Sequence, residues 1–177
     1  MDGRPRDLGY ALLSAAVGAR LEGVARVHWM RGDDVDAATG PLELAFDDGR
    51  LLHLTTAPNA ESLWVRAERW EPSPEWPLTD EDRAYIAEHG TEARVDARSQ
   101  PGWADALGRR LEGVRWLANE FGVLAGAELD FGGARMTFVS WGDDEWVFPG
   151  DASSIPPGWG FRVLAGPDPP IPTPEAR

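Results

Sequence analysis

Two histidines and a glutamate have the residue types and the spacing to support chemistry. His28, Glu43 and His53 each fall among apolar residues, in stretches that alternate like β-strands. Because side chains alternate between the two faces of a strand, the three would share one face if their strands are neighbours. Two imidazoles and one carboxylate could ligate zinc and leave a fourth coordination position open. Together with Arg50, the same residues could instead line a small-ligand pocket.

A simpler interpretation is that this trio forms the polar face of an amphipathic sheet. A later segment of similar sequence, described below, has Ala118 and Phe138 in place of the two histidines. The trio is therefore not intrinsic to the repeated unit, and we predict no metal and no cofactor. The third histidine, His89, is expected at the end of a helix, where an imidazolium would stabilise the helix dipole.

Acidic residues offer two further possibilities. They cluster at residues 33–36, 47–48 and 143–145, but the first cluster lacks the central glycine and terminal glutamate of a calcium loop. We interpret all three clusters as turns, where aspartate is favoured for backbone reasons. Glu43 and Glu128 could form the carboxylate pair of a glycoside hydrolase. Residues that recur in a repeat are more often kept by the fold, so we assign no catalytic residue.

The composition excludes several kinds of catalysis. The chain has no cysteine, which removes disulfides, thiolate nucleophiles and cysteine-ligated metals. All 17 basic residues are arginine, so there is no lysine for a Schiff base or for a Walker A phosphate loop. No Gly-x-Ser-x-Gly motif of a serine hydrolase occurs either. We therefore favour a protein without enzymatic activity, in the reducing interior of a bacterial cell.

The charge of the chain restricts its partners. The net charge of −13 repels nucleic acid and anionic lipid, because binding to either requires clustered basic residues. An acidic surface attracts basic proteins instead. The apolar stretch at residues 8–19 is too short for a membrane span, which needs about 20 residues. These observations predict a cytoplasmic monomer or homodimer with no membrane and no nucleic-acid partner.

Parts of the sequence occur twice. Residues 17–24 match residues 107–114 at six of eight positions. Residues 43–46 then resemble 128–131, and the Trp-Val pair at 64–65 recurs at 146–147. Three matches in the same order are typical of an internal repeat.

Each copy is expected to contain a short apolar helix, an extended segment, a hairpin and a closing strand. The helices are expected at residues 8–17 and 101–107, the extended segments at 24–30 and 114–121, and the closing strands at 63–69 and 145–148. Gly49 and Gly132 suit the hairpin turns, since glycine accepts positive φ. Between the copies, Thr79 and Asp82 resemble a helix start, and His89 and Gly90 a helix end.

These patterns predict an α+β fold built by internal duplication of a helix-plus-antiparallel-strands unit. We expect one composite antiparallel sheet with the helices packed on one face, although two separate domains are an alternative. The predicted domain covers residues 1–165, with repeats at about 7–70 and 99–164 joined by a Pro-rich linker and helix at 71–98. The Pro-rich tail at 166–177 is expected to be disordered.

Nine tryptophans are the most unusual positive feature of the composition. Trp70 and Trp76 flank the Pro-rich linker, and Trp159 lies outside the expected strands. Tryptophan serves both cores and interfaces, because its large ring also carries a polar N–H group. These three are our candidates for a ligand or partner surface, together with His28, Glu43, His53 and Arg50.

The sequence resembles no family that would supply a function. We predict a noncatalytic acidic protein that binds a basic partner, one form of which is an immunity-type inhibitor of a basic bacterial protein. The alternative is a small-ligand binder or hydrolase that uses a cleft between the two repeats.

Overall fold

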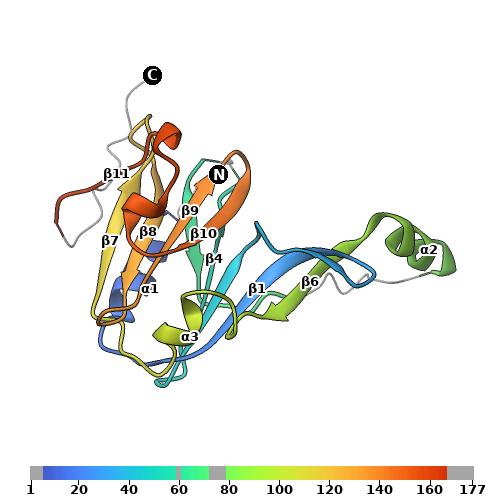
Figure 1. Ribbon diagram of the computed structural model, residues 1–177, viewed down its shortest axis with the longest axis horizontal. Coiled ribbons are helices and arrows are strands. Elements are labelled where there is room, and N and C mark those ends of the chain that lie inside the picture. Colours follow the sequence, from blue (N-terminus) through green and yellow to red (C-terminus); the bar gives the residue numbers. More distant parts are fainter. Residues whose placement is uncertain (1–5, 59–60, 72–78, 167–177) are drawn as a thin grey trace.

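The computed structural model describes residues 6–58, 61–71 and 79–166. It shows a mixed α+β fold in which two antiparallel sheets pack against each other (Figure 1). The helices are short. They are α1 (Arg6–Ala15), α2 (Asp80–His89) and α3 (Trp103–Ala106), followed by the 3-10 turns η1 (Ala152–Ser154) and η2 (Pro157–Trp159).

The first sheet contains the strands of the N-terminal half and one later strand. Its order is β2-β1-β3-β4-β5, and β6 pairs with the other edge of β1. The bounds are β1 (Leu21–Arg31), β2 (Asp34–Asp36), β3 (Leu42–Phe46), β4 (Leu51–Thr56), β5 (Leu63–Arg66) and β6 (Thr91–Asp96). The predicted turn between β3 and β4 is confirmed, with Gly49 at φ 86° and its amide donating to Phe46.

The second sheet contains the strands of the C-terminal half, in the order β10-β9-β8-β7-β11. The bounds are β7 (Gly113–Ala118), β8 (Leu124–Asp130), β9 (Arg135–Trp141), β10 (Asp144–Pro149) and β11 (Arg162–Val163). Its first four strands, β7 to β10, follow one another in the same up-and-down order as β1, β3, β4 and β5 of the first sheet.

The prediction of a single composite sheet was wrong. The strands divide into two sheets because each half has its own apolar face, and two such faces bury each other when they pack face to face. Apart from the ladders within each sheet, isolated β-bridges join the two halves in the described part of the chain. They pair Arg20 with Arg110 and Thr39 with Trp146.

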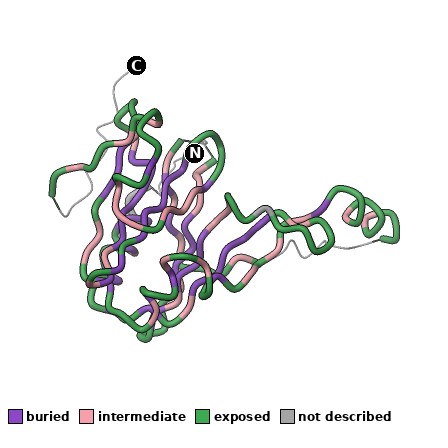
Figure 2. Tube along the Cα trace, viewed as in Figure 1, coloured by how far each residue is buried: buried purple, intermediate pink, exposed green. Residues whose placement is uncertain are grey.

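The main core lies between the two sheets, and a smaller cluster of Leu117, Val139 and Ile155 lies apart from it. Trp103, Trp116, Phe131 and Phe138 are the largest members of the main core, each at most 1% exposed. Tyr10 of α1 packs edge-on against Trp116, with ring centroids 5.3 Å apart. Both α1 and α3 therefore contribute to the core between the sheets, rather than covering one face of a single sheet as expected. Figure 2 shows the buried positions concentrated along the facing strands.

The first sheet continues on one side into an arm that extends beyond the region where the two sheets pack together. The outer ends of β1 and β6 carry β2 and α2 to one side of the molecule (Figure 1). The predicted start of α2 is confirmed, because the Thr79 hydroxyl accepts from the Asp82 amide and the Asp82 carboxylate accepts from the Thr79 amide. No helix in the described part of the chain is both long and apolar enough to cross a membrane.

Candidate functional site

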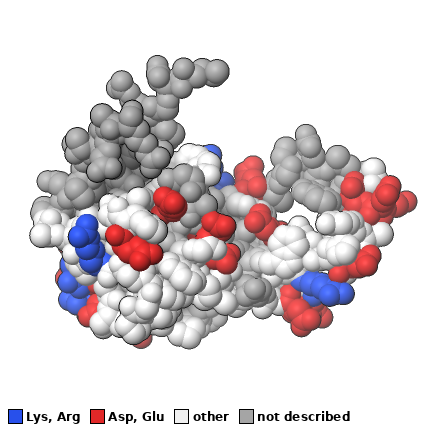
Figure 3. Space-filling view, turned by 90° about the horizontal axis from the view of Figure 1, so that it is seen from above, with Lys and Arg blue, Asp and Glu red and all other residues white. Residues whose placement is uncertain are grey.

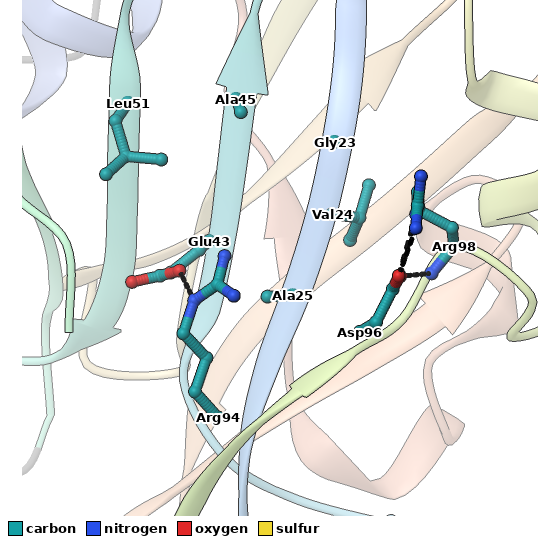
Figure 4. A pocket seen from close by; sticks show the side chains of 9 residues that line it. All are labelled: Gly23, Val24, Ala25, Glu43, Ala45, Leu51, Arg94, Asp96 and Arg98. Atoms are coloured by element: carbon teal, nitrogen blue, oxygen red, sulfur yellow. Dashed lines mark hydrogen bonds and ion pairs between the residues drawn. The ribbon is translucent and has the colours of Figure 1, made fainter. Parts of the chain in front are cut away.

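A pocket of about 200 Å³ lies on the outer face of the first sheet (Figure 4). Its floor consists of small residues, Gly23, Ala25 and Ala45. Two ion pairs also line it, Glu43 with Arg94 and Asp96 with Arg98. The pocket therefore lies on a single sheet and not in a cleft between the halves. Of the four residues predicted to line a pocket, Glu43 alone does so.

Glu43 is held firmly in this pocket. Its side chain is 1% exposed, and both carboxylate oxygens have partners. One oxygen accepts from the backbone N–H of Trp70, and the other accepts from Nε of Arg94 on β6. The arginine and the backbone amide thus satisfy both oxygens of the buried carboxylate. This arrangement suits a structural anchor that fixes β6 and the segment after β5 to the sheet.

Glu128 has the same kind of environment in the second sheet. It is 1% exposed, accepts from Nε of Arg115 at 3.1 Å, and accepts from the backbone N–H of Ala152 at 3.0 Å. Trp70 and Ala152 each come six residues after the tryptophan of a closing strand, Trp64 and Trp146 respectively. The two glutamates lie on the outward faces of different sheets, so they do not form the carboxylate pair that glycoside hydrolysis would need.

His28 does not share a face with Glu43 and His53. Glu43 is the cross-strand partner of Ala25, and residue 28 therefore falls on the opposite face of β1. His28 is 1% exposed, and its Nδ1 lies 2.8 Å from the carbonyl oxygen of Thr39. The prediction that His28, Glu43 and His53 share one face of the sheet was therefore wrong. No group of three metal-ligating side chains is found among the described residues.

His53 is a buried residue on the same face of the first sheet as Glu43. It is the cross-strand partner of Glu43 on one side and of Arg66 on the other. The side chain is 5% exposed, and neither ring nitrogen has a hydrogen-bond partner among the described residues. Burial lowers the pKa of His53 below its ordinary value of 6.5, although the nearby Glu43 carboxylate opposes this shift. At neutral pH the ring is therefore uncharged.

The remaining candidate residues are dispersed. Arg50 is exposed in the turn after β3, where Nε lies 3.2 Å from the Asp48 carboxylate. Trp70 is half-buried beside Glu43. Trp159 stacks on Trp141 with ring centroids 4.1 Å apart and planes 4° apart, over the outer face of the second sheet. Trp76 lies outside the described residues.

The most exposed apolar side chains of the arm were missed by the sequence reasoning. We define the arm as residues 29–36 and 79–92, which comprise the outer end of β1, β2, α2 and the start of β6. Trp29 is 50% exposed, Val35 40% and Tyr85 56%, and α2 contributes no buried residue. A signal was present, because the apolar alternation ends soon after Trp29, where residues 31–36 are mostly charged.

The arm is also strongly acidic. Its acidic residues outnumber its two arginines, Arg31 and Arg83. They are Asp33, Asp34, Asp36, Asp80, Glu81, Asp82, Glu88 and Glu92. Figure 3 shows acidic side chains gathered at the far end of the arm, with a small basic patch between them. Arg83 is paired with Asp80, which reduces the positive charge available there further.

Trp29 is fixed in its exposed position. Its indole Nε1 donates to the carbonyl oxygen of His89 at 3.1 Å. Gly90 lies so close that a Cβ there would be 2.5 Å from Nε1, and its φ is 91°. Glycine is therefore required at residue 90 both by the backbone conformation and by the indole. The tryptophan links β1 to the end of α2 while half of it remains in solvent.

Comparison with protein-family models, with curated proteins and with solved structures finds no significant match.

Proposed function

We propose that the protein is a noncatalytic binding protein that holds a basic protein through its arm. The proposal rests on one observation, that the arm exposes Trp29, Val35 and Tyr85 beside acidic side chains. The helix of the arm, α2, contributes no buried residue to the core. Interfaces are typically anchored by aromatic side chains and surrounded by polar ones. Because the arm contributes little to the core, we attribute its exposed apolar side chains to contact with a partner protein.

Charge supports the same conclusion. The chain carries a net charge of −13, and the arm repeats this excess at its surface. Complementary charge accelerates encounter and discriminates against wrong partners more than it adds affinity. One concrete form of this function is an immunity-type inhibitor that covers the cationic active site of a bacterial protein. That form rests on charge and size.

The two glutamate anchors support a second proposal, that the halves arose by duplication within one composite domain. Arg20 donates to the carbonyl of Gly108, and Arg110 donates to the carbonyl of Gly18. Such reciprocal contacts are typical of a twofold axis. In this view the body is the duplicated scaffold, and the arm is an insertion that carries the binding surface.

The proposed function is tested by capture from the native host followed by native mass spectrometry at low and rising salt. The arm variant is Glu81→Gln, Glu88→Gln and Glu92→Gln together. The matched control neutralises three exposed glutamates of the body, Glu22, Glu112 and Glu120. Both variants change the net charge equally, so a difference between them reports the arm and not the overall charge.

We expect the wild type and the control to retain a stoichiometric basic protein that dissociates as salt rises, and the arm variant to lose it. Screening weakens exposed charge interactions over about 8–10 Å at moderate salt. A partner retained equally by the arm variant, or a small molecule retained in place of any protein, would overturn the proposal.

A further inference from the structure

We infer that Trp29 and Glu92 form a recognition site for an arginine side chain of the basic partner. This inference rests on the proposed function and names the chemistry at its centre. The guanidinium group would stack on the exposed face of the indole and donate to the Glu92 carboxylate.

Trp29 has the geometry of a preorganised anchor. Its ring is half exposed and at the same time fixed, by the bond from Nε1 to the His89 carbonyl and by close contact with Gly90. β1 is also paired on both sides at this point, with Asp36 of β2 and with Glu92 of β6. A preorganised ring loses little conformational freedom when a partner binds, which favours its use as an anchor.

Glu92 is placed to pair with a cation that stacks on Trp29. It is the direct cross-strand partner of Trp29 and is itself exposed. Directly paired residues in antiparallel strands have Cβ atoms about 5 Å apart on the same face. A planar cation above the indole is therefore within reach of this carboxylate. Lysine could supply the charge, but only arginine can stack flat and donate in its own plane.

The chain already contains an arrangement of this kind elsewhere in the first sheet. The guanidinium carbon of Arg66 lies 4.5 Å from the ring centroid of Trp64, and its Nη2 lies 2.6 Å from the carboxylate of Glu68. Arg66 and Trp64 form the cation–π pair found among the described residues. No described guanidinium group lies over the exposed face of Trp29 in this way. The Trp29 site has the tryptophan and the carboxylate, and the partner would supply the arginine.

The test uses the full-length protein and a capped hexa-arginine peptide, with hexa-lysine and the uncharged hexa-citrulline as comparison peptides. Binding is followed at low salt by calorimetry and by the NMR signal of the Trp29 indole N–H. The variants are Trp29→Leu and Glu92→Gln. Trp141→Leu is the matched control, because Trp141 is 41% exposed on the second sheet. Circular dichroism and urea unfolding verify that each variant folds, and Trp29→Phe replaces Trp29→Leu if the latter does not.

We expect hexa-arginine to bind more tightly than hexa-lysine and to shift the Trp29 indole signal. Trp29→Leu should weaken hexa-arginine binding on the order of tenfold, with a smaller loss for Trp29→Phe and no loss for Trp141→Leu. Equal binding of both cationic peptides with no effect of Trp29→Leu would overturn the inference and leave charge-driven binding intact. Failure of hexa-arginine to bind, while the host partner is still captured through the arm, would also overturn it without touching the proposed function.

Discussion

Replacing His53 by leucine should make the protein more stable, and increasingly so as the pH falls. The imidazole is 5% exposed and neither nitrogen has a partner among the described residues. A buried polar group without a hydrogen bond costs about 1–3 kcal/mol. Leucine has nearly the same volume, and such core replacements cost less than about 1.5 kcal/mol. We therefore expect a gain of about 1 kcal/mol in the free energy of unfolding at about pH 8.

The pH dependence follows from the direction of the pKa shift. The pKa of His53 in the folded protein is lowered from 6.5, mainly by burial, with Glu43 opposing and Arg66 assisting. As the pH falls below 6.5, the unfolded chain therefore binds a proton that the folded protein does not accept. Wild-type stability is fully present above that pH and is lost as the pH falls towards the folded pKa. The slope due to this group is at most about 1.4 kcal/mol per pH unit.

The assay is urea unfolding of the wild type and of His53→Leu at about pH 8 and about pH 5. Other groups titrate in both proteins, so the difference between them isolates His53. His89→Gln is the matched control, because His89 is largely exposed at the end of α2. If the stability difference between His53→Leu and the wild type were the same at both pH values, or if the variant were less stable at the higher pH, the reasoning about an unpaired neutral imidazole would be refuted.

Three further predictions concern the scaffold. Glu128→Leu should cost about 2 kcal/mol of unfolding free energy, because the Ala152 amide loses its acceptor. Gly126→Ala should cost about 1–3 kcal/mol, since its Cβ would lie 2.5 Å from the Phe138 carbonyl oxygen. Arg20→Ala and Arg110→Ala should lower stability equally, within about 0.5 kcal/mol, because their hydrogen bonds are reciprocal. All are measured by urea unfolding.

Controls for these variants come from the same chain. Glu128→Gln keeps a carbonyl oxygen for the amide and should cost less than Glu128→Leu. Gly158→Ala is the control for Gly126, because a Cβ at residue 158 meets nothing within 4 Å. Unequal losses for the two arginines would count against a twofold relation between the halves, and an unchanged Gly126→Ala would contradict the close packing of β8 against β9.

Local sequence patterns determined much of the secondary structure. The capping pattern of Thr79 and Asp82 and the glycine at 90 predicted the bounds of α2, because these residues satisfy the helix ends by local hydrogen bonds. The glycine at 49 predicted the turn between β3 and β4 in the same way. The recurrence of Glu43 as Glu128 indicated a role in the fold, and each carboxylate accepts from a backbone N–H in the segment after the closing strand of its sheet.

Tertiary structure alone decided which face each residue of β1 occupies. Residues 24–28 are all buried, so alternation could not separate an inner from an outer face. Arg26 lies on the same side as Val24 and His28, where its guanidinium donates to the Gly40 carbonyl at 2.8 Å. These side chains can face inward because the segment after β2 supplies carbonyl oxygens to them. A pattern of residue types contains no record of such distant acceptors.

The number of sheets and the existence of the arm were also beyond the sequence. One composite sheet and two packed sheets would both satisfy the same apolar alternation. The choice between them depends on how the two apolar faces bury each other. Trp29 illustrates the limit for the functional surface. Its residue type suits a core or an interface equally, and its exposure follows from β1 continuing beyond the body of the first sheet to reach α2.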